Sequence, residues 1–303
     1  MAAKDPAVVA CSVIILTRNS GATLGPCLDS VLSQGMPGCE VIIVDHRSSD
    51  GTTAIVKRYA KKDPRVRLLA EKLPGLGAAR NTGVKAAAGD VIVWTDSDCE
   101  APAGWLEKMV RPIRTQGEDF VQGNEEALDS GFWSNHAQLA GQRHKAKHRR
   151  GKYIGHIDPK NLAMRKNAVL KAGGFDDRIQ FLEDFDLFVR IKKAGFKVRY
   201  LPDVRIKHHH RTTFRAMAET RKLRGFWSAV VYQKYKADFD AEGKKDVTIK
   251  SNYAGTAFGS SLGLLKLLFS EGPSVFFYES VTSIYWRIGI SKGKREWKAV
   301  LKE

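Results

Sequence analysis

The first hundred residues alternate short apolar runs with segments of helical periodicity, and this alternation limits the fold more than any other feature. Apolar runs rich in β-branched residues occupy residues 8–16, 41–44, 66–69 and 91–94. Helical spacing of apolar side chains is found between them, at residues 23–34, 51–62 and 76–88. Strands that are apolar throughout and are joined by helices predict a parallel sheet covered on both faces.

Polar clusters follow three of the four predicted strands. They occupy residues 17–19, 45–50 and 95–98, and each comes directly after an apolar run. In open parallel sheets, ligands bind outside the carboxyl ends of the strands. We therefore predict an α/β fold with a doubly wound, mostly parallel, Rossmann-like sheet, in which one crevice collects all three clusters.

The rest of the chain carries a more mixed pattern. Short strands are predicted at residues 120–123 and 161–165, a helix at residues 181–194, and a strand at residues 198–201 that ends before Pro202. Helical patterns dominate from Thr212 onward. A length of 303 residues allows one large domain with an appendage. We predict an α/β domain over residues 1–210 and a C-terminal helical segment over residues 211–303.

The chain is strongly basic, with a formal net charge of +17 and a pI of about 9.7. Such an excess favours an anionic partner, which could be nucleic acid, an acidic membrane surface or a phosphorylated small molecule. Basic groups at residues 143–152 and 221–224 fit this expectation, although a solvated helix face produces the same pattern. No window reaches 18 uninterrupted apolar residues, so residues 256–270 and 275–290 fit packed or interfacial helices better than spanning ones.

Two carboxylates, Asp96 and Asp98, follow the fourth apolar run and are separated by one residue. Alternate residues of extended backbone point to the same side, so the two carboxylates would repel each other without a cation between them. Mg²⁺ or Mn²⁺ fits this demand and keeps open positions for phosphate oxygens. A solvated acidic turn explains the same pair of residues.

Three further positions are candidates for chemistry. Glu183 and Asp184 open a predicted helix, where the exposed N–H groups favour the ionised form of a general base; simple capping of the first turn is the alternative. His208 begins a run of three histidines and could give one imidazole to the metal site, or belong to a basic surface loop.

Residues 75–80 resemble the start of a dinucleotide-binding fingerprint, but Arg80 stands in place of the third glycine. The motif also follows the third strand instead of the first, and no acidic residue of the ribose-binding kind follows it. A hydride-transfer enzyme is therefore disfavoured. Arg80 at the start of its helix could instead contact a diphosphate, because a guanidinium pairs well with phosphate oxygens.

Taken in order, these motifs resemble the inverting family-2 glycosyltransferases, which have the GT-A fold. The resemblance covers residues 8–230 and is carried by residues 12–19, 44–52, 77–83, 95–98 and 183–190. It implies a nucleotide-sugar-binding half over residues 1–100 and an acceptor half over residues 101–210. His46 stands where relatives usually carry a second aspartate, so UDP and GDP both remain open.

The resemblance also implies a role for each candidate residue. The donor-binding residues would be Thr17 and Asn19 near the base and ribose, Asp45 at the next strand end, Arg80 at the diphosphate, and Asp96 at the ribose and metal. Asp98 would hold the metal, with His208 close to it. Asp184 would be the catalytic base, with Glu183 beside it.

The implied activity is metal-dependent transfer of a hexose from a UDP- or GDP-linked sugar to an acceptor hydroxyl, with inversion. The cofactor would be Mg²⁺ or Mn²⁺. We expect a lipid-linked or polysaccharide glycan as acceptor, addition of a single sugar, and a cytoplasmic protein that is peripheral on an anionic inner membrane face.

Two other classes of function fit the sequence less well. A nucleotidyltransferase would carry a glycine-rich phosphate loop after the first strand, and residues 17–21 lack one. A non-catalytic nucleic-acid-binding protein would leave the ordered acidic motifs unexplained, so nucleic acid is not the expected partner.

Overall fold

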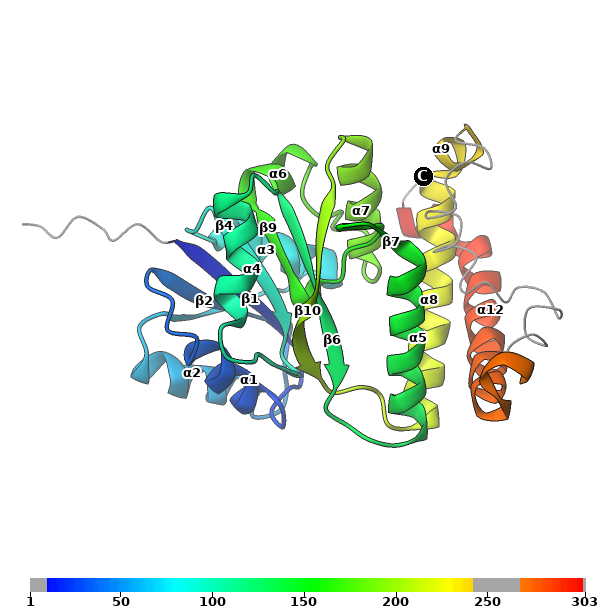
Figure 1. The fold of residues 1–303 in the computed structure, drawn as a ribbon, viewed down its shortest axis with the longest axis horizontal. Helices are drawn as coiled ribbons and strands as arrows, with labels where there is room; N and C mark the ends of the chain where they lie inside the picture. Colours follow the sequence, from blue (N-terminus) through cyan, green and yellow to red (C-terminus); the bar gives the residue numbers. More distant parts are fainter. Residues whose placement is uncertain (1–9, 242–267, 302–303) are drawn as a thin grey trace, which may run out of the picture.

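One mixed sheet carries the fold in the computed structural model, which describes residues 10–241 and 268–301 (Figure 1). Its strands are β1 (Cys11–Thr17), β2 (Cys39–Asp45), β3 (Val66–Ala70), β4 (Val91–Asp96), β5 (Cys99–Glu100), β6 (Phe120–Ala127), β7 (Arg149–Arg150), β8 (Tyr153–Ile154), β9 (Leu162–Arg165) and β10 (Val198–His208). The strand order is β3-β2-β1-β4-β9-β6-β10-β8-β7, and β5 pairs with β10.

The predicted parallel strands form the half of the sheet that ends at β3. β1 pairs in parallel with both β2 and β4, and β2 pairs in parallel with β3. β9 then inserts antiparallel between β4 and β6, after which β6 and β10 are again parallel. The register places Thr17 beside Asp45 and Leu16 beside Asp96, so the ends of β1, β2 and β4 meet at one edge.

Helices cover both faces of the sheet, which explains why β1 is apolar at consecutive positions. One face packs against α1 (Leu24–Leu32), α2 (Thr52–Lys62) and α4 (Trp105–Thr115). The other packs against α3 (Leu76–Ala86), α6 (Lys166–Lys171) and α7 (Glu183–Lys193). Val13 and Ile15 of β1 contribute to the first core and Ile14 and Leu16 to the second, as the alternation of side chains along a strand requires. The predicted doubly wound α/β fold is confirmed.

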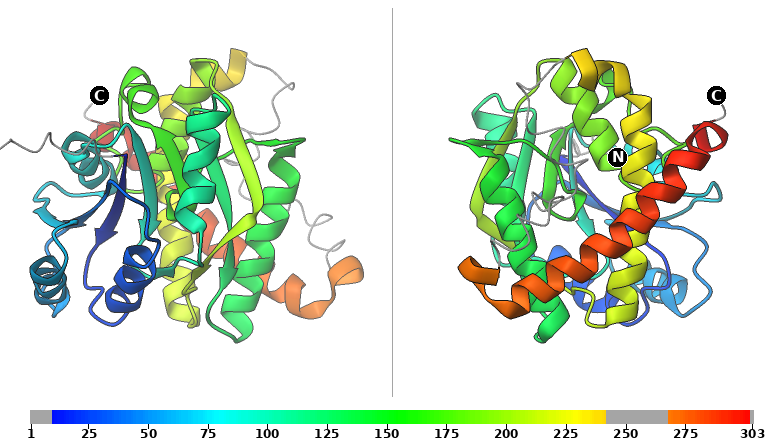
Figure 2. Two further views of the ribbon diagram at one scale, coloured as in Figure 1. Left: turned by 60° about the vertical axis from the view of Figure 1, so that its left-hand side comes forward. Right: turned by 90° about the vertical axis from the view of Figure 1, so that its right-hand side faces the viewer.

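The C-terminal part of the chain is helical, as predicted, and contains α8 (Phe214–Lys234), α9 (Lys236–Ala241) and α12 (Pro273–Leu301). α5 (Phe132–His148), from the middle of the chain, contacts both β6 and α12. Figure 2 shows α12 crossing α8 on the side away from the sheet. Gly225 of α8 and Gly289 and Gly293 of α12 lie at the crossing, where a Cβ atom on any of them would clash with backbone of the other helix. The two helices therefore pack backbone to backbone.

The structure describes one of the two apolar stretches near the C-terminus in full and the other only in small part. Residues 275–290 lie within α12, whose inner face packs on α8 through Tyr278 and Gly289, as expected of a packed helix. Residues 256–267 lie outside the described part of the chain. Among the described residues, the structure contains no helix of the length and hydropathy that crossing a membrane requires.

The prediction that a strand ends before Pro202 is wrong. β10 runs on to His208, and its pairing with β6 shifts register between Tyr200 and Arg205. Proline lacks an N–H for the ladder, and a local irregularity of this kind accommodates it without ending the strand. The extension matters because it carries His208 to the same edge of the sheet as β4, where His208 pairs with Cys99.

Candidate active site

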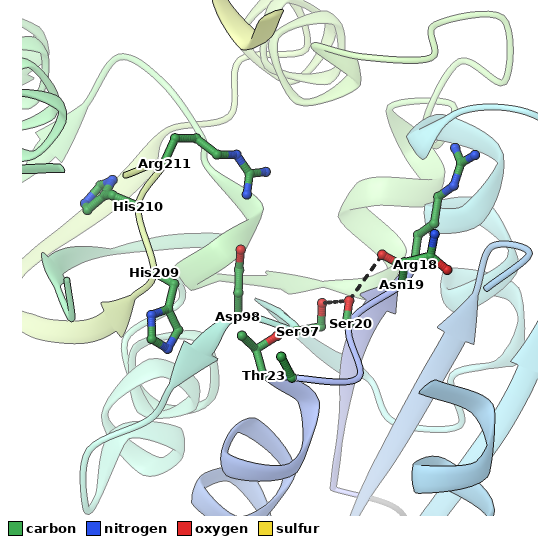
Figure 3. A pocket seen from close by; sticks show the side chains of 10 residues that line it. Arg18, Asn19, Ser20, Thr23, Ser97, Asp98, His209, His210 and Arg211 are labelled. Atoms are coloured by element: carbon green, nitrogen blue, oxygen red, sulfur yellow. Dashed lines mark hydrogen bonds between the residues drawn. The ribbon is translucent and has the colours of Figure 1, made fainter. Parts of the chain in front are cut away.

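A cavity of about 350 Å³ opens at the edge where β1 and β4 end (Figure 3). Its walls are formed by the loop after β1, the turn after β4 and the segment after β10, with lining residues Arg18, Asn19, Ser20, Ala22, Thr23, Ser97, Asp98, His209, His210 and Arg211. Asp98 projects toward the centre, and Arg18 and Arg211 lie on opposite sides. A cavity lined by a carboxylate and two guanidinium groups suits a ligand that brings both a cation and phosphate oxygens.

The loop after β1 is bonded to the loop after β2. Asn19 has a positive φ of 52°, which asparagine tolerates better than most residues. Its Oδ1 accepts a hydrogen bond from the Ser49 backbone N–H at 2.8 Å, and its own N–H donates to the Ser48 hydroxyl at 2.8 Å. The Ser20 hydroxyl lies 2.8 Å from the Ser97 hydroxyl (Figure 3). These bonds bring two of the predicted polar clusters into one wall, together with Ser97 of the third.

Thr17 and Asp45 lie side by side at the ends of β1 and β2 and are both buried. The Asp45 Oδ2 accepts a hydrogen bond from the Ser48 N–H at 3.1 Å. Within the described residues, the Asp45 Oδ1, the Thr17 hydroxyl and the His46 Nε2 have no hydrogen-bond partner. Buried polar atoms are normally satisfied, so this group of open donors and acceptors is fitted to a polar ligand.

Asp98 and His208 come together from positions 110 residues apart in the sequence. The Asp98 Oδ1 lies 3.6 Å from the His208 Nε2, and the His209 backbone N–H donates to the Asp98 carbonyl at 3.0 Å. Burial lowers the pKa of His208 to about 3, so its imidazole is neutral, which is the form that binds a metal.

Three possible metal ligands lie together here, because the Asp98 carboxylate, the His208 imidazole and the Cys99 thiol each place one ligand atom within 4.8 Å of the others. Mg²⁺ and Mn²⁺ prefer oxygen and imidazole ligands, so Asp98 and His208 fit such an ion better than the thiol does. Asp96 is the last residue of β4, two residues before Asp98. Burial raises the pKa of Asp96 to about 7, and the negative charge of Asp98 is the second cause. A cation beside these carboxylates would favour their ionised forms.

Arg80 and Glu183 form a buried ion pair between α3 and α7. The Arg80 Nε donates to the Glu183 Oε1 at 2.6 Å, and the guanidinium lies 5.0 Å from the ring of Trp94. The Arg80 Nη1 is buried without a hydrogen-bond partner in the described structure. The Arg80 guanidinium is therefore held by Glu183 through its Nε and has a free N–H donor at its Nη1.

Asp184 is the second residue of α7, which begins directly after Leu182, a residue with a φ of 62°. Its Oδ1 accepts a hydrogen bond from the Phe185 N–H at 2.7 Å. Burial raises the pKa of Asp184 to about 7, with further contributions from the negative charges of Glu183 and Asp158. A carboxyl with this pKa is suited to accepting a proton near neutral pH.

A second group of charges was not found from the sequence. The Glu125 carboxylate of β6 is bonded to Lys145 at 3.0 Å and to Lys160 at 2.8 Å, and Lys160 also pairs with Asp158 at 2.5 Å. The members come from β6, α5 and a short 3₁₀ turn, so no local spacing connects them. The sequence offers one hint of this group, which is that Glu125 follows the short apolar run of the strand predicted at residues 120–123.

A family model described as glycosyl transferase family 2 matches residues 12–173 of the chain. The chain belongs to this family. The match includes six of the candidate residues, namely Thr17, Asn19, Asp45, Arg80, Asp96 and Asp98, while Glu183, Asp184 and His208 lie beyond it.

Two similar sequences agree with this membership. The chain is 29% identical to the glycosyltransferase AglE of Haloferax volcanii over 64% of each chain. It is 28% identical to the pre-mycofactocin glycosyltransferase of Mycobacterium tuberculosis, over 67% of this family-2 chain and 43% of the relative. The matched segments thus span less than two thirds of these relatives.

Two similar structures show the fold at low sequence identity. The mannosyltransferase PcManGT of Pyrobaculum calidifontis, solved with GDP-Man and Mn²⁺, is 20% identical with a TM-score of 0.65, covering 93% of this chain and 86% of its own. GalNAc-T7, solved with UDP, GalNAc and Mn²⁺, is 17% identical with a TM-score of 0.55, covering 82% and 54%. The family-2 chain therefore has the GT-A fold that its sequence predicted.

Proposed function

We propose that this family-2 chain is an inverting glycosyltransferase that moves a hexose from a UDP- or GDP-linked sugar to an acceptor hydroxyl, using Mg²⁺ or Mn²⁺. The observation that carries the proposal is the meeting of Asp98 and a neutral His208 at the edge of the cavity, 3.6 Å apart. Two similar structures of the same fold were solved with Mn²⁺ and a nucleotide or nucleotide sugar, which supports the choice of cofactor.

The donor would bind along the ends of β1, β2 and β4. The unpartnered polar atoms of Thr17 and Asp45 suit the base and ribose, and Asn19 links the two loops that follow β1 and β2. Asp96 would contact the ribose and metal, while Asp98 and His208 would hold the metal. When bound, that ion would offset the negative charge that builds on the departing nucleoside diphosphate. The free Nη1 of Arg80 would add a donor to the diphosphate.

Asp184 would act at the other end of the reaction. Its carboxylate would accept the proton of the acceptor hydroxyl while the hydroxyl oxygen attacks the anomeric carbon from the face opposite the leaving diphosphate. The carbon–oxygen bond to phosphate breaks as the new bond forms, and the configuration inverts. Glu183 is engaged by Arg80, so we assign it the positioning of Arg80 and of the first turn of α7.

The acceptor half would comprise residues 101–210, with the nucleotide-binding half over residues 1–100 and the helical segment over residues 211–303. A lipid-linked glycan fits a basic chain whose α12 exposes Phe277, Ile284 and Ile288 to solvent. We propose single-sugar addition at an anionic membrane surface on the cytoplasmic side. Absence of binding to anionic liposomes at low salt would remove the membrane part of the proposal.

The experiment that tests the proposed function is a donor-hydrolysis screen over UDP-, GDP- and dTDP-sugars, with and without Mn²⁺. We expect release of the nucleoside diphosphate from one donor only when metal is present. Thermal shift with UDP, GDP and short oligonucleotides provides an independent readout. Stabilisation by oligonucleotide alone would overturn the transferase assignment.

A further inference from the structure

Glu125 lies on the opposite side of the His208 ring from Asp98. The His208 Nδ1 is 3.6 Å from the Glu125 Oε2, while the Nε2 is 3.6 Å from the Asp98 Oδ1. Glu125 is brought there by β6, which pairs in parallel with β10 and places Ile206 beside Glu125. One imidazole thus connects a carboxylate of the acceptor half with the candidate metal ligand at the end of β4.

The surroundings of Glu125 fix both its charge and its position. Lys145 donates a hydrogen bond to the Glu125 Oε1, Lys160 forms an ion pair with the Oε2, and Glu125 is 7% exposed. Two ammonium groups on one carboxylate keep it ionised and leave little mobility to its side chain.

The same two ammonium groups decide where a cation would bind. Glu125, His208 and His210 also place ligand atoms within 4.8 Å of one another. A divalent ion at Glu125 would have to approach Lys145 and Lys160, which repel it. Asp98 lies within range of the charges of Arg211 and Lys160, but in the described part of the chain it forms no direct ion pair with a lysine or arginine. The side of the ring that faces Asp98 is therefore the better place for the ion.

We propose that Glu125 is a positioning residue that accepts the Nδ1 proton of His208 and thereby turns the Nε2 lone pair toward the cation shared with Asp98. The inference rests on the proposed function, because it takes His208 and Asp98 as metal ligands. The contact of 3.6 Å is longer than a hydrogen bond. It should shorten when an ion at Nε2 makes the Nδ1–H a stronger donor, as in the carboxylate–histidine–metal arrangement of other metalloproteins.

The test is the affinity of the full chain for Mn²⁺ in the presence of UDP or GDP, measured from the electron paramagnetic resonance signal of free Mn²⁺. Loss of an outer partner of a metal-bound histidine costs about 10- to 100-fold in metal affinity. We expect a loss of that size for Glu125→Gln. Glu126→Gln is the matched control, because the neighbouring residue of the strand points to the other face, and it should bind Mn²⁺ as the wild type does.

A double-variant cycle separates positioning from a general structural effect. If Glu125 acts through His208, Glu125→Gln should add nothing to the loss caused by His208→Ala. Equal losses in both backgrounds, or unchanged affinity in Glu125→Gln, would overturn the inference.

Glu125→Asp guards against misfolding, since it keeps a charge for the two lysines but withdraws the carboxylate from the ring. It should melt close to the wild type and still bind Mn²⁺ more weakly. Failure of the wild type itself to bind Mn²⁺ with either nucleotide would instead overturn the metal dependence in the proposed function, and this inference with it.

Discussion

Arg80 and Glu183 are 103 residues apart in the sequence, yet the Arg80 Nε donates a hydrogen bond of 2.6 Å to the Glu183 Oε1. The arginine is 4% exposed and the glutamate 2%. This pair joins the helix after β3 to the first turn of α7, where Asp184 is the next residue. Arg80, the proposed contact to the leaving group, is therefore linked through Glu183 to the neighbouring residue Asp184, the proposed base.

Removing one member of this pair should destabilise the protein strongly. Glu183→Gln leaves the buried Arg80 charge without its partner, and such changes cost about 3–5 kcal/mol. We expect the free energy of unfolding, measured by urea denaturation, to fall by about that amount. The Arg80→Met/Glu183→Leu double variant leaves no buried charge at the pair and should recover much of the loss without recovering transfer activity. Equal destabilisation in the single and double variants would contradict this account.

Asp184→Asn should slow transfer strongly while leaving the fold intact. General base catalysis contributes about 10²- to 10⁴-fold, and we expect kcat to fall within that range. Donor affinity should change little, because Asp184 is assigned to the acceptor side. Asp203→Asn, an exposed change on β10, is the matched control. A variant that lost donor binding and activity together would point to a role other than proton transfer.

The rate should depend on pH through Asp184. Its pKa of about 7 means that the proposed base is largely protonated in acid. We expect kcat/KM to rise as the pH increases to about 7 and to level off above it. A profile that is flat between pH 5 and pH 8 would exclude Asp184 as the titrating base.

The same pKa predicts a change in stability with pH. The folded-state pKa of Asp184 lies above the unfolded value of about 3.9, so the folded state binds more protons between these limits. Its contribution to stability is complete below about pH 4 and is lost as the pH rises through 7. Asp184→Asn should therefore reduce the decline in unfolding free energy over this window, as urea titrations at several pH values would show. An unchanged pH dependence would contradict the raised pKa.

Metal removal should stop the reaction reversibly. We expect a chelator to abolish donor hydrolysis, and added Mn²⁺ or Mg²⁺ to restore it. Asp98→Ala should lower kcat on the order of 100-fold or more, because electrostatic stabilisation of the leaving group is lost. Full activity in the presence of a chelator would show that the positively charged side chains of the protein stabilise the leaving diphosphate without a metal ion.

The strand ends that form one edge of the sheet could be predicted from the sequence, because the patterns that define them are local. β1, β2 and β4 each have a run of consecutive apolar residues at the centre, and polar residues follow that run directly, as at Thr17 and Asp96. The positions of His208 and Glu125 depend instead on contacts between residues far apart in the sequence. His208 reaches the site only because β10 continues through Pro202, and Glu125 is neutralised by lysines 20 and 35 residues away. The helical and strand periodicities of a sequence describe neighbouring residues only, so they do not predict contacts over such separations.

The crossing of α8 and α12 provides a prediction that is independent of the chemistry. A side chain at Gly289 would clash with the Lys222 carbonyl and the Phe226 N atom on α8. Gly289→Val should therefore separate the helices locally, which a lowered Tm and faster proteolysis within α12 would reveal. Donor hydrolysis should persist at temperatures where the variant is folded, because Asp98 and His208 lie on the sheet edge.

Gly25→Ala is the matched control for this substitution. Gly25 also lies in a helix, but a Cβ atom there would meet only the Tyr59 hydroxyl at an ordinary distance of 3.9 Å. Replacing glycine by alanine at an unstrained helical position stabilises a protein by about 0.4–1 kcal/mol. The control should thus melt slightly above the wild type while Gly289→Val melts below it. Similar melting of the two variants would mean that α12 docks on α8 without the close approach that the three glycines permit.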